Sequence, residues 1–580
     1  MEPEEYFENP ENAHHRQYRA MLDFFHHKMT AHEVAAKHGY AVSTVYSISR
    51  DLKTKLNDST EDPYFKAVTL GRRLLDEGGT LTAMITALRK NYMSVPEIKT
   101  VLEAAGIDVS LLYIDAVLKK EGFARLPRRD RETKQELKVE IPEKLLAEKT
   151  RLLEFGPEKF TSQLAGLLCF LPFVKAYGID QIITGSAYPE TKQLDRATSI
   201  YAFLALKLSS IKRYSADDLW CMDRGMGLFA GLNVLPKAAW FSSYSSAVKR
   251  EMNISFLKNL YQVWQANGML SDTANLDFTA VPYWGEADPL ENNWSGKRGK
   301  ALASVLALLV QDPDTGIICY GDMTLRHANQ DDAILEFLDF HREGTPDTLK
   351  YLVFDSKATT YQNLARLNRA RIKFVTIRRR GAKLVERINR IDSSAWQKIR
   401  IKRANGKGRN VKFFEEKAKL KDYEEPIRQI YLSDHGKIKP AIIITNDFDS
   451  PAEEIVRKYS KRWLVEKEIA EHVDFFHFNR NSSSMVIKVD FDLTMTILAH
   501  NLYRLFAQDL QGYAHCDAAT IFDKFISNAG EIEIADGLIQ VKLKRKRHLP
   551  MLLEHLDQVA DQEIPWLDGM KVVFSAATTT

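Results

Sequence analysis

Apolar residues recur at helical spacing in two N-terminal segments that follow one plan. The first, "TAHEVAAKHGYAVSTVYSISRDL", opens with Thr30 and Glu33 in a capping-box pattern and has Gly39 between two periodic stretches. We expect two helices joined by a turn at Gly39, in the manner of a helix-turn-helix. The residues predicted to pack these helices together are Val34, Val45 and Ile48.

The plan recurs in "SVPEIKTVLEAAGIDVSLLYIDAVLKKEGFARLPRR", with Ser94 and Glu97 as the capping box and Gly106 at the turn. Its predicted apolar set is Ile98, Leu102, Val109, Ile114 and Val117. A plain helical hairpin gives this pattern too, but two copies, the second followed by the basic "RLPRRDRE", favour DNA-binding helix-turn-helix modules. In the first module the candidate DNA contacts are Ser43 and Thr44.

The pattern becomes one of alternating strands and helices after a charged linker and a helical section that runs to about residue 260. We predict, in order, a strand over "NLDFTAVPYW", a hairpin of "KALASVLALLVQ" and "GIICYGDMTL", a helix over "DDAILEFLDFH", a strand over "LKYLVFDSK", a helix over "YQNLARLNRAR" and a strand over "IKFVTIRRR". Three antiparallel strands followed by two parallel ones make an α/β sheet. Asp277 lies on its first strand and Asp355 ends its fourth, so their carboxylates could meet, although most Asp at strand ends are turn residues.

A further helix is predicted over "PAEEIVRKYSKRWLVEKEIAEHVDFF". Its apolar stripe is Val456, Tyr459, Trp463, Ala470 and Val473. Glu466 falls within this stripe, whereas Glu468 and Glu471 lie off it. Arg462, four residues earlier, could pair with Glu466 on an exposed helix surface, but that pairing does not explain why Glu466 points inward.

Composition narrows the class of protein. The 580 residues exceed what one hydrophobic core usually supports, so several domains are expected. The four cysteines lie far apart without a CxxC pair, which argues against a disulfide framework or a thiolate zinc site and fits a reducing cytoplasm. The start lacks the features of a signal peptide, and the longest apolar stretch, "FTSQLAGLLCFLPFV", is too short to span a membrane. The absence of a GxxxxGK[ST] motif gives no support for ATP-driven work.

Basic residues are unevenly distributed, although the net charge is only +4. Between Arg378 and Lys412, thirteen Lys or Arg accompany only Glu386 and Asp392. A second run, "KLKRKRH", follows "IEIADGLIQVKL", whose Asp-Gly pair predicts a tight hairpin. Either run alone could be a solvated face, but the two together favour a polyanionic partner.

With these motifs the sequence resembles the DDE transposases of bacterial insertion sequences, whose catalytic domain has an RNase H-like fold. The resemblance covers roughly residues 260–510 and rests on "LDFTAVPYWG", on "LVFDSKATTYQNLARLNRARIKFVTIRRR" and on the Tyr-x2-Arg-x3-Glu signature of one branch, matched by Tyr459, Arg462 and Glu466. That branch has a β-rich insertion before its Glu helix, and the basic region resembles it. The later Lys of the signature is Val473 here, which favours a divergent subgroup.

The resemblance implies that Asp277, Asp355 and Glu466 are the catalytic metal ligands. Asp322 is the rival to Asp277, but only Asp277 leaves three strands and a helix before Asp355. Three carboxylates within about 4 to 5 Å would repel by roughly 3 to 4 kcal/mol per pair at an effective dielectric near 20. Divalent cations remove that penalty, and oxygen ligands beside phosphates suit Mg²⁺ or Mn²⁺, with two ions expected.

Further residues are candidates for contacts with DNA. Tyr459 and Arg462 resemble the family's contacts to phosphates at the transposon end, against the alternative of a core tyrosine and a structural ion pair. Trp396 could stack on an unpaired base, although a buried sheet tryptophan is commoner. In the basic insertion the predicted phosphate contacts are Arg400, Lys402 and Arg403.

Together these patterns predict a multidomain α/β transposase in the bacterial cytoplasm, associated with the nucleoid, that cuts and joins double-stranded DNA at its element's terminal repeats and at the target. Two DNA ends must meet, so a homodimer or larger assembly is expected, and no membrane. The alternatives are an RNase H-like nuclease that does not integrate and an inactive DNA-binding regulator. The predicted regions are helix-turn-helix modules at 1–65 and 75–135, a helical region at 145–260, the RNase H-like domain at 261–380 and 446–510, the basic insertion at 381–445, and a C-terminal helix and hairpin region at 511–580.

Overall fold

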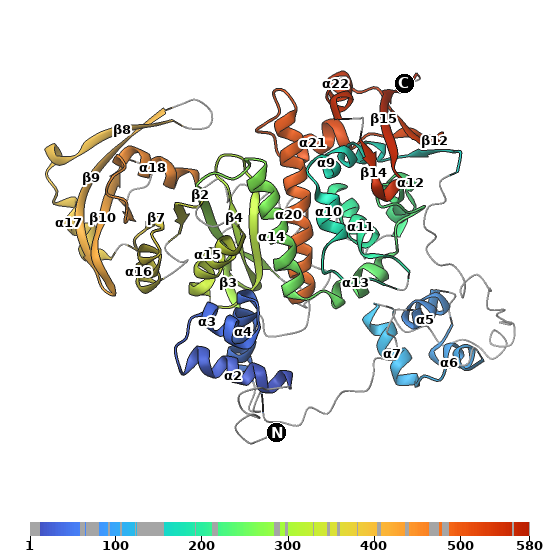
Figure 1. Cartoon of the computed structure of the whole chain (residues 1–580), viewed down its shortest axis with the longest axis horizontal. Coiled ribbons are helices and arrows are strands. Elements are labelled where there is room, and N and C mark those ends of the chain that lie inside the picture. The colour runs from blue at the N-terminus through green and yellow to red at the C-terminus, as the bar shows by residue number, and fades with distance from the viewer. Residues whose placement is uncertain are drawn as a thin grey trace.

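A computed structural model defines the arrangement of most of the chain. It describes residues 12–58, 64, 80–90, 93–104, 107–121, 123, 156–191, 193–211, 218–282, 291–295, 300–328, 330–344, 348–355, 360–379, 381–402, 408–434, 440–462, 475–477, 486–559 and 562–578. The long helix α20 (Val486–Asp509) lies between a large sheet with its helices and a second body of helices and short strands (Figure 1). No helix among these residues is long and apolar enough to cross a membrane.

The large sheet contains the five strands predicted for the α/β segment. They are β2 (Thr273–Pro282), β4 (Lys300–Gln311), β5 (Ile318–Leu325), β6 (Tyr351–Phe354) and β7 (Lys373–Ile377). β2, β4 and β5 pair antiparallel in that order, and β6 joins β2 and β7 in parallel. The predicted pairing directions and the adjacency of the two Asp-bearing strands are therefore confirmed. A further edge strand, β3 (Asn292–Ser295), pairs with β4 and was not predicted.

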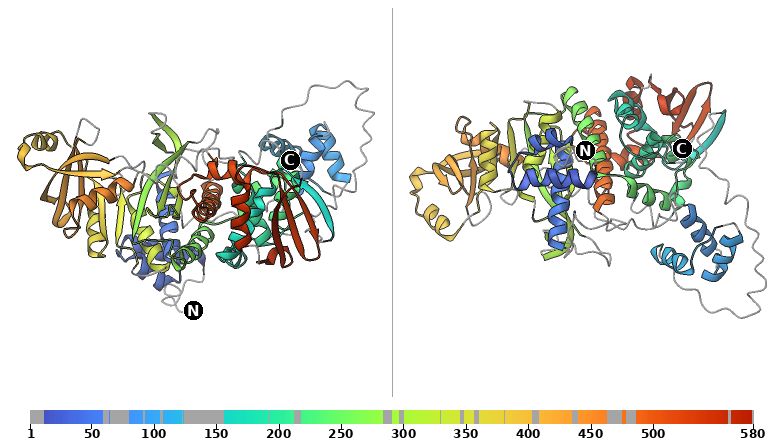
Figure 2. Two further views of the ribbon diagram at one scale, coloured as in Figure 1. Left: turned by 90° about the horizontal axis from the view of Figure 1, so that it is seen from above. Right: turned by 60° about the horizontal axis from the view of Figure 1, so that its bottom comes forward.

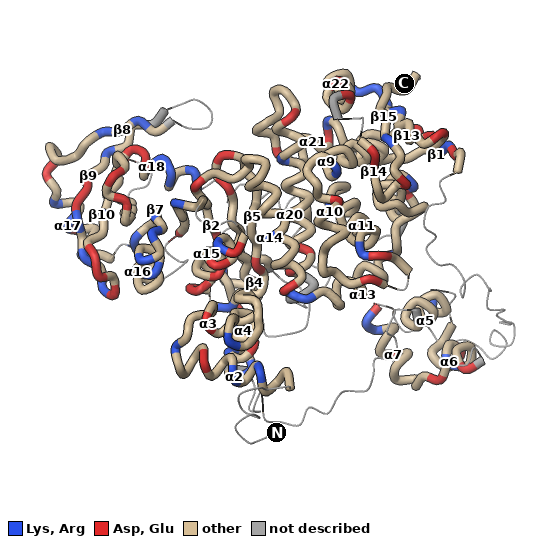
Figure 3. Tube along the Cα trace, viewed as in Figure 1, with Lys and Arg blue, Asp and Glu red and all other residues tan. Residues whose placement is uncertain are grey.

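Strands of the basic region extend this same sheet. They are β8 (Gln397–Lys402), β9 (Gly408–Leu420), β10 (Tyr423–Ser433) and β11 (Ala441–Thr445), and the helix α17 (Ala382–Asn389) precedes them. β11 pairs antiparallel with β7, so a sheet of ten strands runs without a break from the α/β segment into the basic region. Figure 3 marks basic positions along α17 and β8 at this end of the sheet. The sequence predicted strands here, but not that they would continue the core sheet.

Helices cover both faces of the sheet. On one face, Leu276 of β2 and Phe354 of β6 pack in a core with four helices. These are α14 (Arg250–Ala266), α15 (Ala333–Gly344), α16 (Tyr361–Arg369) and α20. On the other face, Val353 and Val375 pack against α18 (Ala452–Lys461). Successive residues of a strand point to opposite faces, so the same strands supply both cores.

The second body joins the helical region to the C-terminal segment. Its helices include α9 (Leu171–Ala176), α10 (Ile179–Thr184), α11 (Arg196–Leu208), α12 (Arg224–Phe229), α13 (Ala238–Ala247), α21 (Ala518–Ile521) and α22 (Leu549–Val559), and its strands are β1 (Glu158–Ser162), β12 (Gly530–Ala535), β13 (Leu538–Leu543), β14 (Glu563–Ile564) and β15 (Met570–Ala576). β1 pairs with β12, which corrects the expectation of a purely helical segment before residue 260. The predicted hairpin is confirmed: Asp536 and Gly537 both have positive φ, 52° and 75°, between β12 and β13.

The N-terminal segments form two three-helix groups. The first contains α2 (Ala13–Phe25), α3 (Ala31–His38) and α4 (Val42–Asp58), with the predicted capping box at Thr30 and Glu33 and a left-handed Gly39. The second contains α5 (Thr80–Lys90), α6 (Val95–Ala104) and α7 (Leu111–Lys120), and all five predicted apolar residues are buried in it. The Ser94 backbone N–H donates to Glu97, as a capping box requires, while Gly106 lies outside the described residues. The second group lies apart from the two large bodies (Figure 2).

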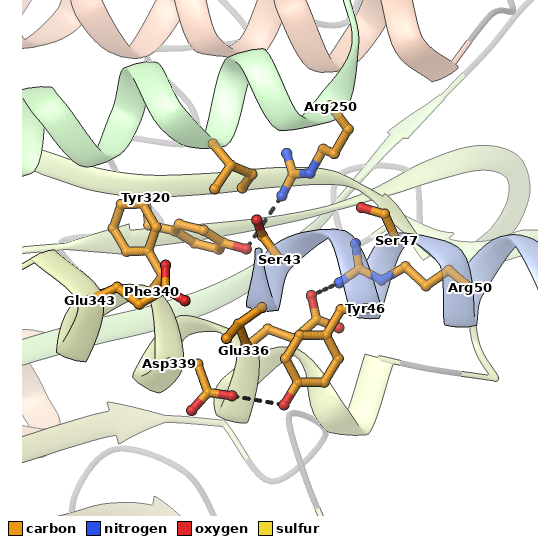
Figure 4. A pocket seen from close by; sticks show the side chains of 12 residues that line it. Ser43, Tyr46, Ser47, Arg50, Arg250, Tyr320, Glu336, Asp339, Phe340 and Glu343 are labelled. Atoms are coloured by element: carbon orange, nitrogen blue, oxygen red, sulfur yellow. Dashed lines mark hydrogen bonds and ion pairs between the residues drawn. The ribbon is translucent and has the colours of Figure 1, made fainter. Parts of the chain in front are cut away.

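The first group is attached to the sheet through charged residues of α4. The Arg50 side chain, 9% exposed, pairs with Asp322 of β5 at 2.9 Å and also with Glu336 of α15. Arg250 of α14 pairs with the same Asp322 oxygen at 3.0 Å. A small cavity of about 20 Å³ remains between α4 and the sheet domain, lined by Tyr46 and other residues of this network (Figure 4). Buried charges are costly unless they are paired, so this network fixes α4 on the sheet domain.

The network predicts a pH dependence of stability. Burial raises the pKa of Glu336 to about 7, and Arg50 only partly offsets this effect. The folded state therefore holds the Glu336 proton more tightly than the unfolded state, so this group's contribution to stability is complete below about pH 4.5 and is lost as pH rises through 7. Glu336→Gln should flatten the decline in the free energy of unfolding across this window by on the order of 2–3 kcal/mol. Calorimetric unfolding between pH 4.5 and 7.5 measures this effect.

The matched control is Glu343→Gln, because Glu343 lines the same cavity but pairs with Lys258 at 2.6 Å away from Arg50. It should keep the pH slope of the unaltered protein. Equal slopes for Glu336→Gln and the unaltered protein would contradict the role given to burial of Glu336.

Candidate active site

Asp277 and Asp355 stand at the same level on neighbouring parallel strands. The register of β2 and β6 pairs Asn275 with Val353. The pairing ends there, two positions before Asp277 and Asp355, and the same offset of 78 residues separates these two aspartates; Asp355 directly follows β6. The sequence predicted that these two carboxylates could meet, and the register agrees with that prediction.

The side chain of Asp277 lies on the face of β2 that meets α18. Ala274 and Leu276 point into the core on the other face, so Thr273, Asn275 and Asp277 share the α18 side. The last turn of α18 contacts this polar row. Asn275 Nδ2 donates to the carbonyl of Lys461 at 3.1 Å, and the Arg462 guanidinium lies 3.0 Å from Asp277 Oδ2.

Sequence reasoning missed Asn275, although a signal was present. In "TANLD" the polar residues at positions 273, 275 and 277 alternate with apolar ones, which marks a polar row on one strand face. Asn275 is fully buried, and its amide bonds the end of the helix on which Tyr459 and Arg462 lie. It therefore ties the strand that carries Asp277 to α18.

Tyr459 and Arg462 share the electrostatic environment of the two aspartates. Burial raises the pKa of Tyr459 to about 12; the Arg462 charge opposes this rise, and the charges of Asp355 and Asp277 add to it. The Arg462 guanidinium lies 5.6 Å from the centre of the Tyr459 ring. Four of the predicted site residues, Asp277, Asp355, Tyr459 and Arg462, thus converge between the central strands β2 and β6 and the end of α18.

The third predicted carboxylate is Glu466, which lies outside the described residues, as does Val473. Within the residues that the structure describes, no group of three or more His, Cys, Asp or Glu side chains could hold a metal ion. The donor set at hand is nevertheless of the right kind, because adjacent carboxylates are the oxygen ligands that Mg²⁺ and Mn²⁺ prefer. In this arrangement the Arg462 guanidinium supplies the positive charge beside Asp277.

The rival carboxylate, Asp322, has a different environment. It is fully buried on β5, which pairs with β4 and so stands away from β6. Burial tends to raise its pKa, but Arg250 and Arg50 hold that pKa down to about 2. The two guanidinium groups thus keep Asp322 ionised as part of the network under α4. This use of Asp322 supports the preference for Asp277.

The other predicted DNA contacts are distributed over several surfaces. Ser43 lines the cavity between α4 and the sheet domain (Figure 4). Thr44, the next residue of α4, is half-buried. Arg400 is exposed on β8, Lys402 is the last residue of that strand, and Arg403 lies outside the described residues.

The second basic run and Trp396 are partly engaged within the protein. Lys542 pairs with Glu533 at 2.8 Å, and Lys546 donates to the carbonyl of Asp523 at 3.0 Å. Trp396 is half-buried against the cluster around Ile388, with its ring 6.3 Å from that of Phe414. The hydrogen bond of Lys546 and the ring packing of Trp396 favour structural roles for these two side chains within the protein.

Comparisons with known proteins identify the domain that holds this site. No curated protein matches the chain. Among solved structures, a cryo-EM structure of the piggyBac transposase synaptic complex with hairpin DNA matches with a TM-score of 0.33 and 12% identity, over 59% of this chain and 78% of that one. The family model described as "Transposase DDE domain" matches residues 276–502, a span that begins one residue before Asp277 and includes Asp355, Tyr459 and Arg462. Residues 276–502 of this chain therefore belong to the transposase DDE domain family.

Proposed function

We propose that this transposase cleaves DNA strands at the ends of its element and joins them to target DNA, using divalent metal ions held by Asp277, Asp355 and Glu466. The observation that supports the proposal is the register of β2 and β6 inside the transposase domain, which pairs Asn275 with Val353, two positions before Asp277 and Asp355. An RNase H-like arrangement of the strands agrees with this assignment, because the two acidic positions fall on its adjacent central strands.

Transposase DDE domains generally use divalent metals, and the residues at this edge suit them. Asp277 and Asp355 provide carboxylate oxygens, and Glu466 follows α18 at four residues beyond Arg462. Bound Mg²⁺ or Mn²⁺, as two ions, would activate a water or a 3′-hydroxyl and stabilise the leaving oxygen. Asn275 keeps the end of α18 against β2, so that Arg462 and the chain leading to Glu466 start beside the two aspartates.

Arg462 and Tyr459 fit the role of contacts to the DNA backbone. A guanidinium presents paired N–H donors that match a phosphate, and Arg462 carries them beside the carboxylates. Tyr459 is held in its un-ionised form, since burial raises its pKa to about 12, so its hydroxyl can donate to a phosphate oxygen. Both side chains would orient the scissile strand at the metal ions.

Binding of DNA away from the cleavage site is assigned to the N-terminal groups and to β8. The helix pairs α3–α4 and α6–α7 have the capping and packing expected of helix-turn-helix modules that read the element ends. Ser43, at the start of α4, lines the cavity between this helix and the sheet domain, so of the two predicted contacts of the first module only Thr44 is kept as a proposed DNA contact. On β8, Ile399 points into the core while Arg400 is exposed, so the strand can present cations to a DNA backbone.

Transposition joins two element ends to one target, so we infer that the protein acts as a dimer or larger assembly formed on DNA. We favour an enzyme over an inactive DNA-binding regulator. Two acidic side chains beside bound phosphates weaken DNA binding unless metal ions offset their charge, so they are of no use to a protein that only binds DNA. Cleavage of a terminal-repeat duplex followed by joining to a second duplex separates transposition from simple nuclease activity.

Removing one charge from the predicted trio should abolish chemistry and spare binding. Glu466→Gln keeps volume and most hydrogen bonds, but removes a negative charge needed to hold a metal ion, so cleavage and joining should fall by roughly 10³-fold or more. Asp277→Asn and Asp355→Asn should behave alike, and combining them should add little, because the three act as one unit. The assay is cleavage of a labelled terminal-repeat duplex in Mg²⁺ or Mn²⁺, with DNA binding measured in parallel.

Glu468→Gln and Glu471→Gln are the matched controls, since both lie on the same sequence segment but off the apolar stripe. They should cut at nearly the unaltered rate. A fully active Glu466→Gln beside an inactive Glu468→Gln would show that the helix register has been misassigned.

Neutralising the basic strand should weaken DNA binding without changing sequence preference. Replacing Arg400, Lys402 and Arg403 by Gln removes phosphate contacts, and each lost contact should lower the slope of log affinity against log salt by about 1. Fluorescence anisotropy with a labelled duplex across a salt series measures that slope. The comparison variant is Lys419→Gln, an exposed lysine near the other end of the neighbouring strand β9. An unchanged slope in the triple variant would assign the β8 cations to solvent.

A further inference from the structure

Arg462 and Asp277 form an ion pair at the position proposed for a metal ion. Arg462 Nη1 lies 3.0 Å from Asp277 Oδ2, and the two side chains are only 6% and 13% exposed. The other oxygen, Oδ1, accepts the backbone N–H of Phe278 at 2.9 Å. In this structure both carboxylate oxygens of Asp277 are therefore engaged within the chain.

The backbone next to Arg462 is held in place, so a change of partner must come from its side chain. Asn275, which is fully buried, donates to the carbonyl of Lys461, immediately before Arg462. The last carbonyls of a helix lack partners within the helix, and this bond supplies one of them from β2. The long Arg462 side chain can still rotate about its own bonds while the end of α18 stays on the strand.

A guanidinium and a divalent cation compete for the same carboxylate oxygen. Two cations a few ångströms apart repel strongly where water is largely excluded, so a metal ion on Asp277 Oδ2 disfavours the observed position of Arg462. A DNA phosphate is an alternative partner for Arg462. Like a carboxylate, it is an anion that accepts the paired N–H donors of a guanidinium.

Building on the function proposed above, we propose that Arg462 is the resident counter-cation of Asp277 and exchanges it for a DNA phosphate when a metal ion binds. Arg462 acts here as a positioning residue: it occupies Asp277 in the DNA-free protein and releases Oδ2 when DNA arrives. Metal binding and DNA binding are then positively coupled. Because coupling between two ligands is reciprocal, each ligand raises the affinity of the protein for the other.

The test is a calorimetric titration of Mn²⁺ into the DNA-free full-length protein. Arg462→Gln removes the competing cation and should bind Mn²⁺ about tenfold more tightly than the unaltered protein, within the usual range of coupling between sites. Asp277→Asn removes the ligand and should weaken Mn²⁺ binding. In parallel, anisotropy with a fluorescein-labelled 30-base-pair duplex, with and without Mn²⁺, should show that Mn²⁺ tightens DNA binding by the unaltered protein and tightens it less in Arg462→Gln, because the phosphate contact made after metal binding is lost.

The matched control is Arg457→Gln, which removes an exposed arginine of the same helix that pairs with Glu453 one turn earlier. It should leave the Mn²⁺ affinity unchanged, which separates loss of the Asp277 partner from a general change in net charge. Circular dichroism and thermal unfolding check that each variant is folded.

If Asp277→Asn weakens Mn²⁺ binding while Arg462→Gln leaves it unchanged or weaker, the exchange is refuted and the proposed metal site stands. If Asp277→Asn has no effect on Mn²⁺ binding, the proposed metal site itself fails. Should Arg462→Gln not fold, the decision passes to Arg462→Met, which removes the charge but keeps a long, unbranched side chain. That variant should also bind Mn²⁺ at least about threefold more tightly, and no change would refute the exchange.

Discussion

The parallel pairing of β2 with β6 is the constraint on which the active site depends. A slip of one residue in this pairing would turn Asp277 from the α18 side into the core with Leu276. The register is fixed because both faces are buried: Leu276 and Phe354 pack under α14 and α20, while Val353 packs under α18. Hydrophobic packing on two sides thus places two carboxylates next to each other, which their own electrostatics would oppose.

A cation of the same chain compensates for that opposition. Arg462 pairs with Asp277, and Asn275 holds the backbone at the end of α18 beside β2. The polar row of β2 is therefore the counterpart of its apolar row: one builds the core and the other binds the last turn of a helix. A site assembled in this way combines rigid backbone positions with one long, adaptable side chain.

The charged network under α4 also neutralises buried carboxylates, at the contact between α4 and the sheet domain. Asp322, Glu336 and Asp490 bring three carboxylates into a buried region, and Arg50 and Arg250 supply the opposite charge. Arg50 comes from the N-terminal group, so the sheet domain lacks part of its charge balance unless α4 is in place. Removing one partner from such a network leaves an uncompensated buried charge, which is strongly destabilising. The N-terminal group is thus bound to the sheet domain by electrostatics as well as by packing.

The sequence by itself determined the local structure and the candidate chemistry. Capping residues, periodicity and turn chemistry predicted α3, the apolar core of the second helical group, the strands β2, β4, β5, β6 and β7 and the Asp536-Gly537 hairpin, because each depends on neighbours within a few residues. The predicted strand order and the resemblance to DDE transposases selected Asp277 and Asp355, and the Tyr-x2-Arg-x3-Glu signature selected Tyr459 and Arg462. Only the tertiary structure decided how distant segments meet: that β1 joins the C-terminal sheet, that β11 continues the core sheet, that Asn275 binds the end of α18 and that Arg50 neutralises Asp322. These contacts join residues up to several hundred positions apart, and no local pattern specifies a partner at that distance; packing and the pairing of buried charges do.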